Sequence, residues 1–292
     1  MNSVQRIFGI TWRSILVAVG YIAGLMLAGI IGGMLGWQPS ADPNDGKNLA
    51  LLFISTILLG VFLGPLASRL KLSRGQHFIL WASLIIFNLG SVALEGAYFA
   101  PDLVNIPIPV LLAQQSLATL GAAWMITWLF AQAGRSLSWM NALRTRPWVS
   151  WLWRLIASSL SYLAFYFVFG GLNYSLVTRP YYESHAGGLT VPAPEVVLTL
   201  ESIRGVLIVF SVLLFLLSIR GTRRQLIIST GWLLFAIGGI IPLFWQITTL
   251  PLFLLFASAI EILFQNFLTG AVAAWLLGIE GHSDEMTASA IP

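Results

Sequence analysis

The sequence predicts an all-α membrane protein: an eight-transmembrane-helix bundle, built as two tandem four-helix repeats of the same orientation. Three observations predict this fold. Hydrophobic residues make up 58% of the 292 residues and charged residues only 9%, whereas a soluble domain of this length carries far more charge. Long apolar runs recur along the whole chain, and most Lys and Arg lie in every second connection between these runs.

Each apolar run is long enough to cross a bilayer, which takes ~20 helical residues. Lipid offers no partners for open backbone groups, so runs of this length are predicted to be helices. The first run follows Arg6 and Arg13 and exceeds the ~7–15 apolar residues of a signal peptide, so we expect it to be a retained span. The predicted spans are 14–36, 48–68, 77–99, 109–131, 153–176, 195–218, 226–247 and 252–278.

The basic residues predict the orientation. With the N-terminus inside, Lys47 and Arg179 lie outside and Arg204 lies within a span, while all other Lys and Arg lie inside. This asymmetry predicts a multi-pass protein of the plasma membrane with both termini cytoplasmic. The residues assigned to the inside are Arg6, Arg13, Arg69, Lys71, Arg74, Arg135, Arg144, Arg146, Arg154, Arg220, Arg223 and Arg224.

Similar segments in the two halves predict the tandem repeat. Residues 1–134 are expected to form the first four-helix unit and 153–280 the second, with a cytoplasmic interfacial linker at 135–152 and a cytoplasmic tail at 281–292. Because each unit has an even number of spans, both would point the same way, and a site would form where they meet. The matching segments are Trp12-Arg13 with Trp153-Arg154, Arg74-Gly75-Gln76 with Arg223-Arg224-Gln225, and the stretch from Gln114 to Trp124 with that from Gln265 to Trp275.

Ionisable residues inside the sixth span are candidates for function, because each costs ~2.5–3.5 kcal/mol to insert. Glu201 and Arg204 lie three residues apart and so share one helix face. They could line an outward-open cavity and bind a polar solute. Alternatively they neutralise each other as a local ion pair that fixes the helix to a neighbour, or both extend to the outer interface.

The eighth span carries a polar stripe with an acid near its centre. Glu261 lies ten residues after Pro251, about 15 Å into a core of ~30 Å. No basic residue of the same helix can pair with it, so it carries a proton or is met by Arg204 or water. Proton coupling and a neutral hydrogen bond across helices are the two interpretations. The stripe is Ser258, Glu261, Gln265 and Thr269, with Asn266 beside it.

Weaker polar patterns occur in three other spans. Glu95 near the outer end of the third span, with Gln114 and Gln115 in the fourth, forms a smaller polar group. If the repeat holds, Gln114 is the counterpart of Gln265. The fifth span places Ser158, Tyr162, Tyr166 and Asn173 on one face, where tyrosines more often pack than bind a ligand.

Several site types are not indicated. The chain has no cysteine, which excludes thiolate metal sites, and its three histidines lie at a span end, in a loop and in the tail. No H-E-x-x-H, P-loop or G-x-S-x-G motif occurs. We expect no metal, no cofactor and no nucleic-acid partner, because the basic residues are spread along the chain.

These features favour a small-solute transporter or permease, in one version coupled to protons, with an outward-facing polar cavity. Its partners would be membrane lipids, a small polar solute and protons. The first alternative is a non-transporting subunit or assembly factor of a membrane complex. The second is an intramembrane lipid-modifying enzyme, which lacks an identifiable second catalytic group. An enzyme is therefore the less favoured class, and the oligomeric state stays open. The candidate solute- and proton-binding residues are Glu261, Gln265, Glu201, Arg204, Gln114 and Glu95.

Overall fold

The computed structural model describes residues 3–37, 45–101, 106–132 and 139–279. In this part of the chain it has eight helices long and apolar enough to cross a membrane, which confirms the predicted all-α fold with eight candidate spans. The predicted tail, 281–292, and the first residues of the predicted linker, including Arg135, lie outside the described residues.

The first four spans are single helices. They are α1 (Ser3–Met34), α2 (Asp45–Ala67), α3 (Arg74–Phe99) and α5 (Ile108–Phe130). In this half α1 packs on α2 and α5, and α5 packs on α3. A capping box starts α3, in which Ser73 accepts from the backbone of Gln76 while the Gln76 side chain accepts from the backbone of Ser73.

The fifth span is longer than predicted and is interrupted by two π-helical segments. After the short α6 (Trp139–Leu143), the chain runs through α7 (Trp148–Phe165), a π segment (Tyr166–Gly170), α8 (Gly171–Asn173), a second π segment (Tyr174–Thr178) and α9 (Arg179–Glu183). The whole span covers Trp148–Glu183. Its 36 residues exceed the ~20 that a bilayer core requires, so it extends beyond that core or tilts within it.

The last three spans follow a short 3-10 turn (Ala186–Gly188). They are α10 (Pro194–Ser218), then α11 (Arg223–Phe235) continued by a π segment (Ala236–Ile240) and α12 (Ile241–Trp245), and finally α13 (Leu252–Leu277). In this half α7 packs on α10 and α13, and α13 packs on α11. A second capping box, Thr222 with Gln225, starts α11.

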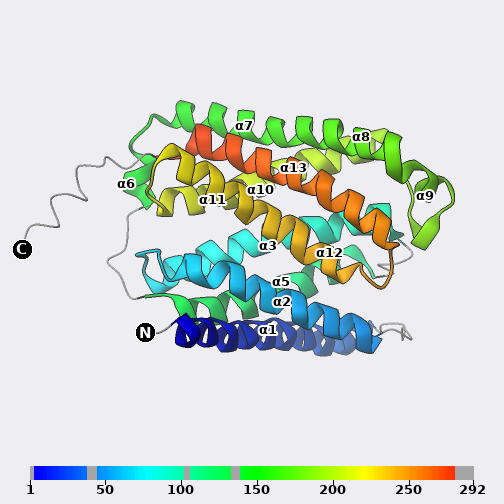
Figure 1. Ribbon diagram of the computed structural model, residues 1–292, viewed down its shortest axis with the longest axis horizontal. Coiled ribbons are helices and arrows are strands. Elements are labelled where there is room, and N and C mark those ends of the chain that lie inside the picture. Colours follow the sequence, from blue (N-terminus) through cyan, green and yellow to red (C-terminus); the bar gives the residue numbers. More distant parts are fainter. Residues whose placement is uncertain (1–2, 38–44, 102–105, 133–138, 280–292) are drawn as a thin grey trace, which may run out of the picture.

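The two halves meet along the middle of the bundle, where α3 contacts α10 and α2 contacts α12. Figure 1 shows α1, α2 and α5 on one side and α7 and α13 on the other, with α3 and α10 between them. The start of α1 and the end of α13 lie at the end of the bundle occupied by α6, and α9 lies at the opposite end. We call these the α6 end and the α9 end.

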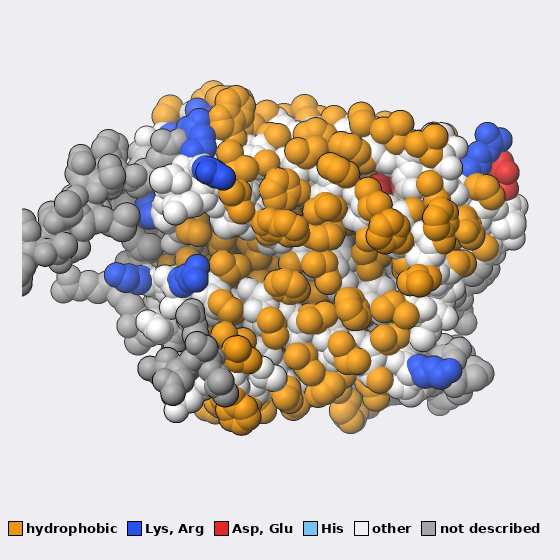
Figure 2. All heavy atoms as spheres, viewed as in Figure 1, with side chains coloured by type: hydrophobic (Ala, Val, Ile, Leu, Met, Phe, Trp, Pro, Cys, Tyr) orange, Lys and Arg blue, Asp and Glu red, His pale blue; other side chains and the backbone are white. Residues whose placement is uncertain are grey.

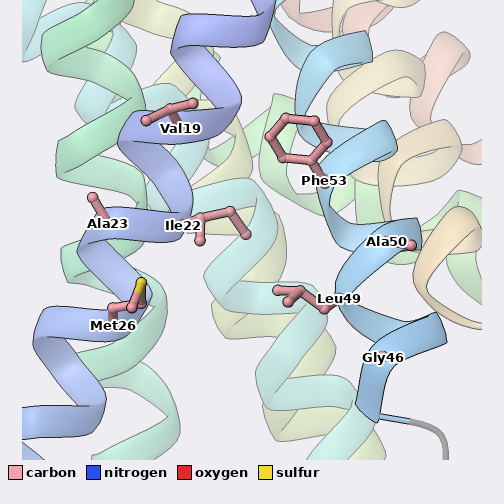
Figure 3. Close-up of a pocket in the computed structure, with 8 residues that line it drawn as sticks. All are labelled: Val19, Ile22, Ala23, Met26, Gly46, Leu49, Ala50 and Phe53. Carbon is pink, nitrogen blue, oxygen red and sulfur yellow. The ribbon is translucent and has the colours of Figure 1, made fainter.

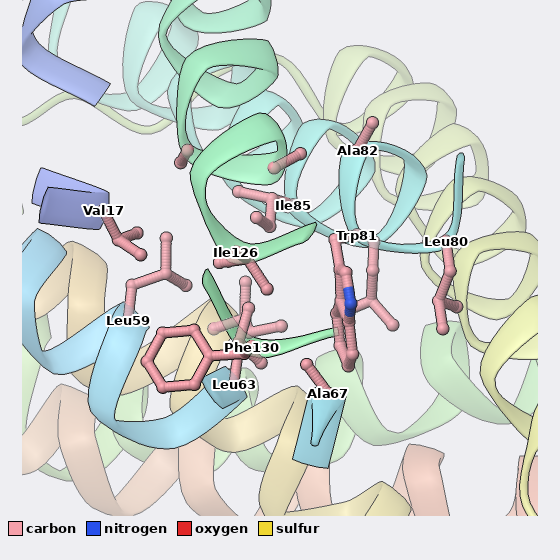
Figure 4. Close-up of a cluster of buried hydrophobic side chains, with 14 of the residues drawn as sticks. Val17, Leu59, Leu63, Ala67, Leu80, Trp81, Ala82, Ile85, Ile126 and Phe130 are labelled. Atoms are coloured by element: carbon pink, nitrogen blue, oxygen red, sulfur yellow. The ribbon is translucent and has the colours of Figure 1, made fainter. Parts of the chain in front are cut away.

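Apolar side chains fill the interior and also cover the outer surface. One buried cluster centres on Trp81, Leu59 and Ile126, all fully buried in the first half (Figure 4). A second lies among α7, α10, α11 and α13. Many large apolar side chains, such as Trp124 and Phe256, are exposed, and Figure 2 shows them spread over the visible face. A surface of this kind suits hydrocarbon as solvent.

Glycine permits the closest helix contact in the first half. A Cβ on Gly24 of α1 would overlap the carbonyl oxygen of Leu117 in α5, and a Cβ on Gly121 would overlap that of Gly20. In the sequence, the glycines at 24, 29, 32, 33 and 36 form a pattern that is typical of a helix-packing surface. However, a Cβ on Gly29 or Gly33 would meet nothing within 4 Å, so these two are not packed within the described chain.

The substitution Gly24→Ala is therefore expected to lower stability. The added methyl group must push α1 and α5 apart, which costs about 1–3 kcal/mol in a well-packed interior. Gly29→Ala is the matched control on the same helix, and it should leave stability unchanged or raise it slightly because alanine favours helix. Thermal unfolding of the two variants in detergent tests this, and equal midpoints would contradict it.

Candidate functional site

The centre of the site is an ion pair within α10. Arg204 Nη1 lies 2.9 Å from Glu201 Oε1 and 2.8 Å from Oε2. The exposed fraction is 0% for Glu201 and 6% for Arg204. The predicted pairing of these two residues on one helix face is present. The interpretation that both extend to the outer interface does not fit this burial.

A second carboxylate reaches the same guanidinium from the other half of the protein. Glu95 Oε2 of α3 lies 2.7 Å from Arg204 Nη1. Its side chain is 28% exposed, whereas that of Glu201 is 0% exposed. The sequence placed Glu95 in a separate group with Gln114, but the fold pairs it with Arg204. The ion pair therefore joins the two halves where α3 meets α10.

Tyr162 of α7 completes the shell around Glu201. Its hydroxyl donates to Glu201 Oε2 at 2.8 Å, and its ring lies 5.8 Å from the Arg204 guanidinium. Gly205 permits this approach, because a Cβ there would lie 2.9 Å from both Tyr162 Cδ1 and the Ser159 carbonyl oxygen. Tyr162 is thus a hydrogen-bonding member of the site as well as a packing residue.

Glu261 of α13 lies in a different setting. The side-chain amide of Asn173 donates to Glu261 Oε2. Within the described residues, no side-chain nitrogen of Lys, Arg or His lies within 4 Å of a Glu261 carboxylate oxygen. A Cβ on Gly170 would be 3.1 Å from Glu261 Oε1, so glycine lets the fifth span pass directly over the carboxyl group. The sequence suggested Arg204 as a partner of Glu261, but the side chain that hydrogen-bonds to Glu261 is Asn173.

The fifth span is shaped around these groups. The two π segments, Tyr166–Gly170 and Tyr174–Thr178, bracket Asn173. A π segment inserts one extra residue into an α-helix and turns the residues that follow it, and such segments often occur at functional sites. Tyr166, in the first of them, interacts electrostatically with Glu95, Glu201, Arg204 and Glu261. Glu95, Glu201 and Arg204 are in direct contact, and Glu261 lies within electrostatic range of Glu95 and Arg204; we call these four residues the carboxylate cluster.

The two glutamines predicted for the site differ in their surroundings. Gln265 is buried on α13, one turn beyond Glu261. Gln114 is only half-buried, and the buried amide is its neighbour Gln115, whose Nε2 donates to Tyr21 Oη at 2.9 Å. This pair joins α5 to α1. Nothing in the described structure brings Gln114 into the carboxylate cluster.

Another polar contact between the halves joins α3 to α10 and was missed in the sequence. Asn88 of α3 donates through Nδ2 to Ser211 Oγ of α10 at 3.1 Å. Asn266 of α13 donates to the Leu234 carbonyl at 3.4 Å, and a Cβ on Gly238 would lie 2.8 Å from Asn266 Nδ2. In the sequence, Asn88 appears only as a lone Asn in an apolar run. Its partner Ser211 lies on a distant helix, so the sequence does not show the pairing.

An apolar crevice of about 450 Å³ lies between α1 and α2 (Figure 3). Its wall offers no charged or hydrogen-bonding side chain, so it suits hydrocarbon and not a polar solute. It belongs to the first half and contains no member of the carboxylate cluster. The lining residues are Val19, Ile22, Ala23, Met26, Gly46, Leu49, Ala50 and Phe53.

Together with Tyr162 and Asn173, the cluster offers carboxylate, guanidinium, phenol and amide groups. In the described part of the chain, no three His, Cys, Asp or Glu side chains are grouped so that they could hold a metal ion. The arrangement can bind and release protons, or hold a polar group between carboxylates of the two halves. Comparison of the chain with protein-family models, with curated proteins and with solved structures gave no match.

Proposed function

We propose that this protein is a secondary transporter of a small polar solute and that protons are its coupling ions. The observation that carries the proposal is the carboxylate cluster: Glu95 of one half contacts Arg204 of the other, Arg204 also binds Glu201, and Glu261 lies within electrostatic range, all within the apolar bundle. Solute and ion sites of secondary transporters typically form within the membrane where two structural repeats meet.

The charge of the cluster supports protons or a cation as ligands. The cluster holds three carboxylates and one guanidinium, so full ionisation would leave two uncompensated negative charges. Each such charge within a bilayer costs ~2.5–3.5 kcal/mol. A proton on Glu261 removes one of them, and Glu95, which is partly exposed, is the carboxylate that a cationic group of the solute could reach.

The packing supports the predicted tandem repeat. In each half the first span packs on the second and fourth, and the fourth packs on the third. Both third spans start with a capping box, at Ser73 and at Thr222. Two such units with parallel orientation would be related by an axis along the membrane normal. The contacts of α3 with α10 and of α2 with α12 would then be equivalent, and the cluster would lie at the first of them.

The distribution of basic residues supports cytoplasmic termini and the plasma membrane as location. Arg69, Arg74, Arg144, Arg154 and Arg223 belong to the α6 end, while Lys47 and Arg179 belong to the α9 end. Figure 2 shows most blue side chains gathered at the α6 end. By the positive-inside rule the α6 end is cytoplasmic, so the cluster lies in the outer half of the membrane.

Thiol accessibility tests whether water reaches the cluster. The chain has no native cysteine, so Ser258→Cys introduces a single thiol, one turn before Glu261 on the half-buried face of α13. Cells are treated from outside with a charged, membrane-impermeant thiol reagent. We expect labelling of this variant at a rate above that of Ser202→Cys, which lies next to the exposed Ile203. Ser184→Cys, at the exposed α9 end, is the positive control.

The alternative function is a non-transporting subunit whose polar groups hold helices together. The complete burial of Glu201 and Tyr162 favours it, because a satisfied, self-neutralising network stabilises a bundle without any ligand. If Ser258→Cys resists the reagent while Ser184→Cys reacts, the transporter proposal fails and the subunit takes its place.

A further inference from the structure

Two arginines at the α6 end converge on the end of α13. Arg146 Nη1 donates to the Leu276 carbonyl at 3.0 Å, and its Nη2 donates to the Gly278 carbonyl at 2.8 Å. Arg154 Nη1 donates to the same Leu276 carbonyl. The last turn of a helix leaves carbonyls without partners and carries a partial negative charge. Both guanidinium groups are therefore held at fixed positions close to one another.

Among the described residues, this arginine pair carries more positive charge than the neighbouring side chains balance. Burial lowers the pKa of Arg146, and the nearby Arg154 and Arg223 lower it further. Within the described residues no carboxylate lies within 4 Å of Arg146 or Arg154. The helix end offsets only about half an elementary charge. Two fixed guanidinium groups with so little compensation attract an anion, and phosphate oxygens suit their geometry.

Tryptophans place the arginine pair at the level of lipid headgroups. The Arg154 guanidinium lies 4.8 Å from the Trp153 ring, and that of Arg146 lies 4.9 Å from the Trp151 ring. Trp153 is 48% exposed and Trp148 is 73% exposed. Exposed indoles at the end of a span settle in the interfacial region of a bilayer. A phosphate group at this level can be part of a lipid headgroup. The apolar part of the same lipid can then lie against the apolar surface of α7.

We propose that Arg146 and Arg154 bind the phosphate of an anionic membrane lipid in the leaflet at the α6 end. Basic sites between transmembrane helices at this level suit anionic headgroups. The acyl chains would lie against Leu152 and Ile156, which are exposed on α7. This inference does not depend on the proposed transport function, because the site lies at the α6 end and contains no member of the carboxylate cluster.

The test measures lipid binding by the full-length protein in neutral detergent. Phosphatidylglycerol or phosphatidylcholine is added in steps, and bound lipid is counted by native mass spectrometry. We expect retention of phosphatidylglycerol above that of phosphatidylcholine. One basic residue near a membrane contributes ~1 kcal/mol, so Arg154→Gln should weaken phosphatidylglycerol binding about five-fold, and the variant with Arg146→Gln added should weaken it further.

Three controls decide the outcome. Arg69→Gln removes the same charge from an exposed position at the same end and should leave the binding of phosphatidylglycerol unchanged; an equal loss would show a diffuse charge effect and overturn the proposal. Arg154→Lys keeps the charge and should retain most binding even where Arg154→Gln folds poorly. Equal retention of the two lipids by the native protein, or full displacement by millimolar inorganic phosphate, would also overturn it.

Discussion

Replacing Arg204 by glutamine is expected to destabilise the protein more than any other single substitution at the cluster. Glu201 would lose its only basic partner within 4 Å in the described chain, and so would Glu95. Removing one member of a buried ion pair costs about 3–5 kcal/mol, because the remaining charge has no compensation. Thermal unfolding in detergent should show a midpoint several degrees below that of the native protein.

Two further variants separate charge from packing. Arg179→Gln breaks an ion pair of similar length, 2.7 Å to Glu183, that is more than half exposed on both sides, so it should cost at most about 1 kcal/mol. Combining Arg204→Gln with Glu95→Gln and Glu201→Gln removes the uncompensated charges and should restore part of the loss. A triple variant no more stable than Arg204→Gln would contradict the electrostatic explanation.

Replacing Glu261 by glutamine is expected to abolish proton coupling while leaving the fold intact. The amide of glutamine has nearly the shape of the carboxyl group and keeps an oxygen that can accept from Asn173. It cannot take up or release a proton. In liposomes with an entrapped pH dye, a small polar solute moved by the native protein should change the internal pH. In the variant, the rate of internal pH change should be lower by at least about ten-fold, as expected for an essential proton-transferring group.

The control for this experiment is Glu195→Gln. Glu195 is exposed in the first turn of α10, so its neutralisation removes a carboxylate without touching the cluster. A hydrophobic carbodiimide gives a second measurement, since it modifies carboxyl groups in apolar surroundings. It should label Glu261 in the native protein and should not label Glu195. Unchanged proton movement by Glu261→Gln for every solute that the native protein moves would exclude the coupling role.

The predictability of the fold follows from how strongly lipid selects apolar sequence. Eight runs of sufficient length are enough to predict eight spans, because an incomplete crossing would leave backbone groups unsatisfied. The extension of the fifth span to Glu183 and its two π segments were not predictable. A single inserted residue hardly changes the hydropathy of an apolar run, although it turns every later side chain to a new direction.

The predictability of the site follows from the distance along the chain between its partners. The pairing of Glu201 with Arg204 depends only on helix geometry, so spacing was enough to predict it. The pairings of Arg204 with Glu95 and of Glu261 with Asn173 join different helices, and hydropathy does not show which helix faces meet. Gln114 was chosen as the repeat counterpart of Gln265, and a match between repeats does not show which of two neighbouring glutamines is buried.

The placement of Glu201 and Arg204 on one helix also bears on how the chain is made. A ribosome delivers α10 to the membrane after α3, and a guanidinium alone in lipid would delay that insertion. Because Glu201 lies one turn ahead of Arg204 and binds it with two oxygens, α10 enters as a nearly neutral segment. Before α10 arrives, Glu95 has not yet met Arg204, and it lies close to the end of α3, where water can reach it.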